Sequence, residues 1–178
     1  MKALGVDIGK KRDPAALVQV ERRGSFCHVT HVGRLPIGTP YDQVGTAIGK
    51  IGAGADIVVA DTGGVGEAAL DLVARDHPDL LLWRVVLTSG KTVKVNREER
   101  RASVPKVRLI GHIAAALRAG RLLVDAGEVG LALLKEMHQF VARQSTRGHI
   151  TMCAESGSHD DLVIALALAL LGLKLGGL

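Results

Sequence analysis

Four aspartates at three places in the chain have the residue type and the surroundings of metal ligands. Asp7 closes the apolar run ALGVD, Asp61 closes IVVAD before the glycine-rich TGGVG, and Asp160 and Asp161 open the apolar run LVIALALAL. Carboxylates at the ends of buried elements repel one another unless a cation neutralises them, and oxygen-only ligation favours Mg²⁺ or Mn²⁺. Two such ions about 4 Å apart activate a water and stabilise the leaving oxygen of a phosphodiester. The pattern therefore predicts nuclease chemistry.

Each aspartate also has a structural interpretation when taken alone. Asp7 can form a turn, Asp61 can cap the helix that follows it, and Ser158 has the spacing of a capping box with Asp161. Capping does not require Asp160 as well. The three places together favour a metal site over three separate caps.

Two further residues lie close to these aspartates in the sequence. Asp13 is an additional candidate ligand, although an Asp that precedes a Pro commonly forms a turn. His159, directly before Asp160 and Asp161, is a candidate to orient the metal ligands by hydrogen bonding rather than to bind the ion itself. Adjacent helical positions differ by about 100°, and the last helix is apolar nearly all round. The sequence therefore leaves open whether Asp160 or Asp161 is the direct ligand.

The elements that must position these residues belong to a chain of 178 residues, which is about one domain. We expect a single domain over residues 1–178. Hydrophobic residues make up 47% and charged residues 23%, as in a folded globular protein, and two cysteines without CxxC spacing suggest neither disulfides nor zinc. The apolar run at 162–173 is too short to span a bilayer. We therefore expect an intracellular protein with no membrane partner.

Hydrophobic periodicity predicts an α/β fold in which a mixed central sheet is flanked by helices. Strands are expected at 2–7, 15–20, 27–35, 57–60, 80–87, 122–124 and 149–153. Helices are expected at 40–51, 65–75, 105–117, 128–140 and 158–171. The first three strands follow one another directly and are predicted to be antiparallel. The polar segment 89–103 is predicted to be an exposed hairpin or loop.

Residues 91–108 carry an excess of positive charge equal to the net charge of +5 of the whole chain. The candidate DNA-binding residues in this segment are Lys91, Lys94, Arg97, Arg100, Arg101 and Lys106. A charge run can be a solvated face, but this one can also contact a polyanion. Aromatic residues are only 2% of the chain, which disfavours base stacking and favours contact with a duplex backbone.

Two motifs resemble nucleotide-binding sequences but lack essential parts. SGKT at 89–92 resembles a P-loop, yet the position of its first glycine is Val85. GVGEAA at 64–69 resembles a dinucleotide fingerprint, but no acidic residue ends the following strand to hold a ribose. We interpret these glycines as a sharp turn beside the metal site.

The motifs in this order resemble the carboxy-terminal nuclease domain of phage large terminase subunits, the DNA-packaging enzymes, which have a ribonuclease H-like fold. The resemblance rests on GVDIG with DPAALV, VVADTGGVGEAALDLV, SVPKVRLIGHIAAALRAGRLLV, and HITMCA leading to SHDDLVIALALAL. It covers nearly the whole chain. It implies endonucleolytic cleavage of double-stranded DNA that depends on two Mg²⁺ or Mn²⁺ ions, with Asp7, Asp61 and Asp160 or Asp161 as ligands.

The resemblance also implies partners. Terminase nucleases work with an ATPase motor domain, a portal and a small terminase subunit, here in the cytoplasm of a bacterial host. The chain has no Walker A sequence, so we expect an isolated nuclease domain.

Two alternative functions remain open from the sequence. A Holliday-junction resolvase shares the order of acidic residues, but it usually has Glu where this chain has Asp61. A non-catalytic DNA-binding or nucleotide-binding module could use GVGEAA and the basic segment.

Overall fold

The computed structural model describes the chain except residues 10–12, 64–65, 126, 145–149, 155–159 and 178. An eight-stranded mixed sheet has the order β6-β7-β5-β4-β1-β2-β3-β8. Its strands are β1 (Lys2–Asp7), β2 (Ala16–Arg23), β3 (Phe26–Arg34), β4 (Ile57–Asp61), β5 (Leu82–Thr88), β6 (Lys94–Asn96), β7 (Arg101–Pro105) and β8 (Leu122–Val124). β1, β2 and β3 are antiparallel neighbours, whereas β4 runs parallel to β1 and β5 parallel to β4. The predicted mixed α/β sheet is confirmed.

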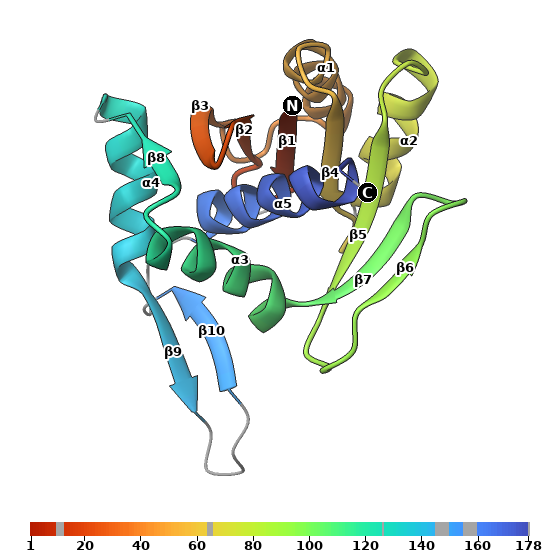
Figure 1. The fold of residues 1–178 in the computed structure, drawn as a ribbon. Helices are drawn as coiled ribbons and strands as arrows, with labels where there is room; N and C mark the ends of the chain where they lie inside the picture. The colour runs from red at the N-terminus through yellow and green to blue at the C-terminus, as the bar shows by residue number, and fades with distance from the viewer. Residues whose placement is uncertain (10–12, 64–65, 126, 145–149, 155–159, 178) are drawn as a thin grey trace.

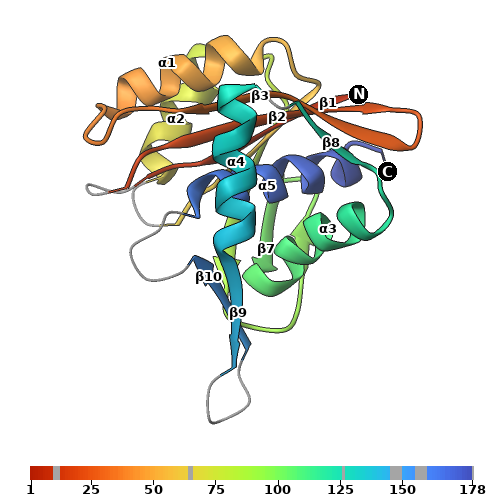
Figure 2. The same ribbon diagram turned by 90° about the vertical axis from the view of Figure 1, so that its left-hand side faces the viewer.

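Helices cover both faces of this sheet (Figures 1 and 2). α1 (Tyr41–Gly52) and α2 (Gly66–Asp76) lie on one face, and α3 (Lys106–Arg118) and α5 (Asp161–Leu175) lie on the other. α4 (Glu128–Gln139) packs beside α5 and leads into a separate two-stranded sheet of β9 (Phe140–Gln144) and β10 (Ile150–Ala154). No helix in the described residues is long and apolar enough to cross a membrane.

The central strands are apolar on both faces because helices cover both. In β4, Ile57 and Val59 belong to the core under α5, and Val58 and Ala60 belong to the core under α1 and α2. This alternation follows from the two-residue period of a strand. A strand buried on both faces reads as a continuous apolar run, as IVVA does.

α5 lies directly on the backbone of β1. A Cβ added at Gly5 would collide with the backbone of α5 at Ala165 and Ala169. From the helix side, a Cβ at Gly172 would lie 3.0 Å from the side chains of Ala3 and Val59. Every residue of α5 except Lys174 is buried. The helix is therefore apolar all round because it fills the centre of one core layer.

The structure differs from the expected elements at three places. The segment 89–103 does form a hairpin, but β7 joins the main sheet beside β5 and buries Ala102 and Val104. The strand expected near 149–153 is β10, and its partner β9 begins at Phe140, where the helix was expected to end. α5 begins at Asp161 with Asp160 as its N-cap, three residues later than predicted.

Candidate metal centre

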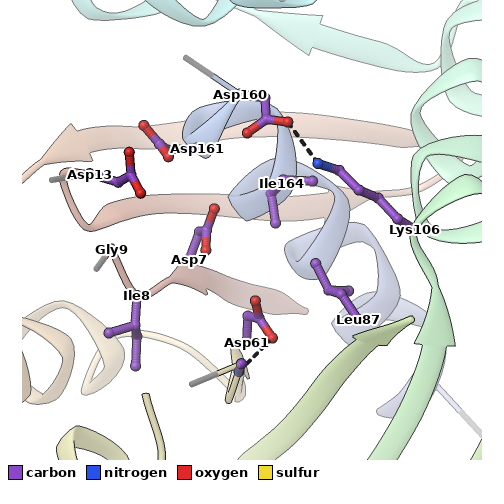
Figure 3. Close-up of a pocket in the computed structure, with 11 residues that line it drawn as sticks. Asp7, Ile8, Gly9, Asp13, Asp61, Leu87, Lys106, Asp160, Asp161 and Ile164 are labelled. Carbon is purple, nitrogen blue, oxygen red and sulfur yellow. Dashed lines mark hydrogen bonds and ion pairs between the residues drawn. The ribbon is translucent and has the colours of Figure 1, made fainter. Parts of the chain in front are cut away.

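Five aspartates and one lysine line a single pocket of about 280 Å³ beside the amino end of α5 (Figure 3). The polar residues of its lining are Asp7, Asp13, Asp61, Lys106, Asp160 and Asp161. Leu87 and Ile164 form part of the apolar wall. The structure thus brings together all four predicted ligands and the additional candidate Asp13.

Parallel pairing of β1 with β4 places the first two aspartates side by side. Val6 pairs with Ala60, so the next residues, Asp7 and Asp61, emerge together at the carboxyl edge of the sheet. This edge is where open α/β sheets generally bind ligands. In Figure 3, Asp7 lies between Asp61 on one side and Asp13 and Asp161 on the other.

The glycine-rich turn after β4 holds the carboxylate of Asp61. The backbone N–H of Gly63 donates a hydrogen bond to Oδ1 of Asp61 over 2.9 Å. A Cβ at Gly63 would lie 3.2 Å from the other carboxylate oxygen. Thr62 anchors the turn to β5, because its backbone N–H and hydroxyl both donate to the carbonyl oxygen of Val85, over 2.8 and 3.2 Å. Glycine here allows the backbone to bend close to the carboxylate.

The late aspartates face the same pocket from the start of α5. Asp160 is the N-cap, but its side chain makes no capping hydrogen bond. Its Oδ2 instead accepts a hydrogen bond from Nζ of Lys106 over 2.7 Å. Asp161, the first helical residue, is only 7% exposed. The expected capping box is therefore wrong in register, and Ser158 lies outside the described residues.

Carboxylate crowding perturbs the acid at the centre of the group. The pKa of Asp7 is raised well above its usual range, first by burial and then by the negative charges of Asp61, Asp161 and Asp160. Lys106 acts in the opposite direction. Desolvation and like charges both disfavour the ionised form. A divalent cation would relieve this unfavourable electrostatic energy.

The donor chemistry of the pocket fits a hard divalent ion, because carboxylate oxygens are the ligands that Mg²⁺ and Mn²⁺ prefer. No group of three or more His, Cys, Asp or Glu side chains among the described residues stands close enough to hold an ion as it lies. Binding therefore requires the carboxylates to turn toward a common point. Asp160, which now contacts Lys106, is one that would have to adjust.

The basic residues expected to contact DNA have different surroundings. Lys106, at the start of α3, lines the acidic pocket, and Arg101 forms an ion pair with Glu67 of α2. The remaining four are exposed on or beside the hairpin of β6 and β7: Lys91, Lys94, Arg97 and Arg100. His159 lies outside the described residues.

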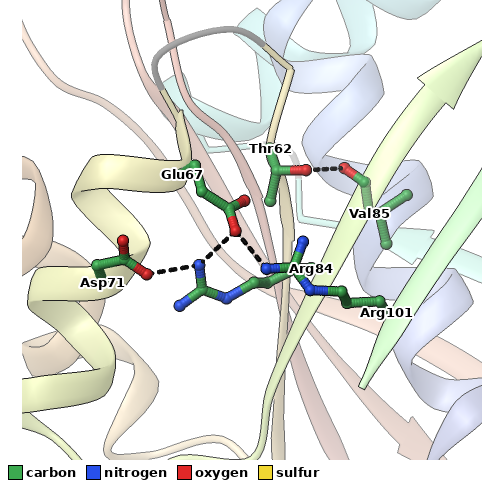
Figure 4. Close-up of polar contacts among 6 residues, drawn as sticks. All are labelled: Thr62, Glu67, Asp71, Arg84, Val85 and Arg101. Atoms are coloured by element: carbon green, nitrogen blue, oxygen red, sulfur yellow. Dashed lines mark hydrogen bonds and ion pairs between the residues drawn. The ribbon is translucent and has the colours of Figure 1, made fainter. Parts of the chain in front are cut away.

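A second group of charged residues lies where α2 meets β5 and β7 (Figure 4). Arg84 of β5 forms ion pairs with Glu67 over 2.9 Å and with Asp71 over 2.8 Å. Glu67 also pairs with Arg101 of β7. Two carboxylates are thus matched by two guanidinium groups.

Sequence reasoning missed Glu136, which is only 5% exposed. Its Oε2 accepts a hydrogen bond from the backbone N–H of Leu162 over 2.9 Å, within the first turn of α5. A detectable signal was its spacing, because Glu136 falls one turn after the fully buried Leu133 on the apolar face of α4. An acid on a core-facing stripe needs a specific partner.

Comparison with known proteins agrees with this architecture. Residues 4–173 match the family model described as the terminase RNaseH-like domain. Comparison with curated protein sequences gave no match.

Similar solved structures are nuclease domains of large terminases. One is the large terminase nuclease from thermophilic phage G20c with bound magnesium, with 22% identity and a TM-score of 0.73 over 96% of this chain and 80% of that chain. The same nuclease with bound cobalt has 21% identity and a TM-score of 0.72, with 96% and 80% covered. The large terminase nuclease domain from bacteriophage SPP1 with bound Mn has 11% identity and a TM-score of 0.62, with 94% and 84% covered.

These likenesses establish a shared ribonuclease H-like fold, and the family match runs from Leu4 in β1 to Leu173 in α5. The chain belongs to the terminase RNaseH-like domain family.

Proposed function

We propose that this chain is a metal-dependent endonuclease that cuts double-stranded DNA during viral genome packaging. The observation that carries the proposal is the convergence of Asp7, Asp61, Asp160 and Asp161 on one pocket. The raised pKa of Asp7 supports it, because burial and the neighbouring carboxylates disfavour its ionised form and a bound cation would offset both. Structures of similar nucleases contain magnesium, cobalt or manganese.

Two Mg²⁺ or Mn²⁺ ions bound in this pocket would activate the attacking water and stabilise the leaving oxygen of the phosphodiester. The four aspartates would hold these ions, with Asp13 as a further candidate ligand. Two other parts of the chain would assist without binding an ion themselves. The turn at Gly63 orients the carboxylate of Asp61, and Lys106 is the only cationic side chain in the described lining of the pocket. Lys106 can attract a phosphate once Asp160 turns to an ion.

The exposed basic residues of the β6–β7 hairpin supply the proposed DNA contact. β7 ends directly before Lys106, which lines the pocket. The hairpin therefore lies next to the pocket in the sequence. Lys94, Arg97 and Arg100 are exposed and can bind phosphates. Contacts of this kind carry no sequence information, so cleavage should have little sequence preference.

The proposed setting is the packaging assembly in the cytoplasm of a bacterial host. There, an ATPase motor domain, the portal and the small terminase subunit would restrict access of DNA to the pocket. The isolated chain is expected to cut slowly and without response to ATP.

A plasmid-nicking assay tests the proposal. The chain is incubated with supercoiled plasmid in Mn²⁺, Mg²⁺, Ca²⁺ or EDTA, each with and without ATP, beside the Asp61→Asn variant. Nicking should require Mn²⁺ or Mg²⁺, ignore ATP and disappear in the variant. Cleavage that survived EDTA would contradict the metal site, and binding without any cleavage would favour a non-catalytic module. Preferential cutting of a four-way junction would favour a resolvase.

A further inference from the structure

The amino end of α5 is capped by a residue from another helix. The first backbone N–H groups of a helix lack intrahelical acceptors, and the side chain of the N-cap residue usually accepts from one of them. In α5 the N-cap is Asp160, which makes no such hydrogen bond. The N–H of Leu162 donates instead to Glu136 of α4 over 2.9 Å. A residue well suited to capping therefore occupies the cap position, while Glu136 supplies the cap.

Glu136 is held in place by its own partner. Its carboxylate is buried and forms an ion pair with the guanidinium of Arg34 at the end of β3. Burial of a carboxylate is costly unless the charge is paired and hydrogen-bonded, and Arg34 and Leu162 provide both. A negative charge at this end also interacts favourably with the dipole of α5. Three elements distant in sequence thus meet at one helix end.

This arrangement leaves the neighbouring aspartates to the pocket. Asp160 turns its carboxylate toward Lys106, and Asp161 lines the same pocket. Leu162 follows these two residues directly. The contact with Glu136 therefore fixes the backbone immediately after both candidate ligands.

We propose that Glu136 is a positioning residue for the metal centre, holding the first turn of α5 so that Asp160 and Asp161 face the pocket. The inference rests on the proposed function, because it concerns the same site. Without Glu136, the N–H of Leu162 needs a new acceptor, and the side chain of the N-cap residue Asp160 is the nearest in sequence. A carboxylate that caps its own helix is turned away from the pocket.

Calorimetric titration of the metal-free chain with Mn²⁺ tests this role. Glu136→Ala should weaken Mn²⁺ binding about 10-fold, as is usual when a residue that orients ligands is removed. Glu136→Gln keeps an oxygen for the N–H of Leu162, and it should recover most of the affinity. If Glu136→Ala does not fold, Glu136→Asp serves, because its shorter side chain withdraws the acceptor but keeps the charge near Arg34.

The other end of the same helix offers a matched control. Arg22 of β2 donates a hydrogen bond to the carbonyl oxygen of Leu173 over 2.7 Å. Arg22→Ala removes this hydrogen bond at the carboxyl end of α5, far from the pocket. It should lower the unfolding temperature but change Mn²⁺ affinity by less than about twofold, since a loss confined to helix stability does not reorient the first turn.

Hydrogen exchange in the metal-free state gives a readout independent of activity. In Glu136→Ala the amide of Leu162 should exchange severalfold faster than in wild type, because a cap from the partly exposed Asp160 protects it less than the buried Glu136 does. The amide of Ile164, which donates to the carbonyl oxygen of Asp160 over 2.9 Å, should change much less.

The outcomes separate the two proposals. Failure of the wild type to bind Mn²⁺ would overturn the proposed function itself. If the wild type binds and folded Glu136→Ala binds equally well, the positioning role is overturned. Equal losses in Glu136→Ala and Glu136→Gln, or in Glu136→Ala and Arg22→Ala, would also overturn it, because neither pattern depends on the acceptor for Leu162.

Discussion

Two clusters of carboxylates in the described part of the chain differ in the number of cationic side chains that they face. In the cluster at α2, Glu67 and Asp71 face Arg84 and Arg101 across the edge of the sheet (Figure 4). In the pocket at α5, five aspartates face Lys106 as the only cationic side chain of the described lining (Figure 3). The first cluster joins elements, and the second accumulates negative charge.

The difference shows which of the two clusters is suited to bind an ion. Paired guanidinium groups satisfy carboxylates by hydrogen bonds and charge together. In the pocket at α5, burial and then the charges of neighbouring carboxylates raise the pKa of Asp7. Among the described residues, the ratio of carboxylates to cationic side chains, rather than the number of acids, therefore distinguishes the candidate ligand site from the structural network.

The largest expected effect comes from neutralising an acid in the unbalanced cluster. Asp61→Asn should reduce metal-dependent nicking by more than about 100-fold, beyond the loss usual for residues that only orient ligands. The unfolding free energy of the metal-free protein should stay the same or rise, because like-charge repulsion is removed. Nicking rates and urea unfolding measure the two effects. If Asp61→Asn were destabilised but fully active, Asp61 would have a structural role like that of the acids at α2.

The balanced cluster should respond in the opposite sense. Arg84→Met leaves Asp71 without its guanidinium partner, and it should lower the unfolding free energy by about 1–2 kcal/mol, given the partial exposure of these acids. Mn²⁺ affinity should not change. Urea denaturation and calorimetry check both points. Loss of Mn²⁺ binding in a stably folded variant would show that the two clusters are not independent.

A smaller effect is expected from the exposed basic hairpin. Replacing Lys94, Arg97 and Arg100 with Ala should weaken DNA binding similarly for unrelated sequences. It should also reduce the salt dependence of log K by about one unit for each phosphate that the protein no longer neutralises. Fluorescence anisotropy at several salt concentrations measures this slope. Arg101→Ala is the comparison variant, because its ion pair with Glu67 predicts a loss of stability instead. An unchanged slope in the triple variant would identify the hairpin as a solvated face.

The smallest effect concerns an unbalanced contact between basic groups. Burial and the charge of Lys174 lower the pKa of His112 to about 4, and Nζ of Lys174 lies 2.9 Å from Nδ1 of His112. The unfolded state therefore binds the proton first, near pH 6.5. Stability is fully present above that pH and is lost as pH falls toward about 4.

Unfolding curves at pH 7 and pH 4 test this titration. The wild type should lose more stability than His112→Gln, by less than about 1 kcal/mol after solvent screening. Equal losses would mean that His112 does not respond to its neighbour. At this contact, loss of the proton from His112 removes the repulsion from Lys174, whereas at the aspartate pocket a bound ion would offset the repulsion between carboxylates.

Most of the fold was predictable because its strands and helices have strong periodicity. The runs that end at Asp7 and Asp61 lie in strands that are parallel neighbours, and this pairing explains why the two residues meet. The start of α5 was misplaced because Ser158 and Asp161 have the spacing of a capping box. Local spacing cannot reveal a cap that comes from another helix.

The remaining differences also arise from contacts between distant segments. Arg101 belongs to a basic run in the sequence, but tertiary pairing joins it to Glu67. Glu136 contacts Leu162, and only the packing of α4 beside α5 makes that partner visible. β9 begins at Phe140, where the helical pattern of α4 ends, and it is defined by its pairing with β10.

The close packing of α5 against Gly5 of β1 has a consequence for the order in which the protein folds. Asp7 and Asp61 are synthesised long before the helix that fills the core above β1, and contacts between such distant segments form slowly. Until that helix docks, the apolar face of β1 and β4 has no cover, and the nascent chain is prone to aggregate. Assembly of the proposed nuclease centre is therefore a late event. A chain that ended before α5 would carry Asp7, Asp13 and Asp61 but would lack Asp160 and Asp161.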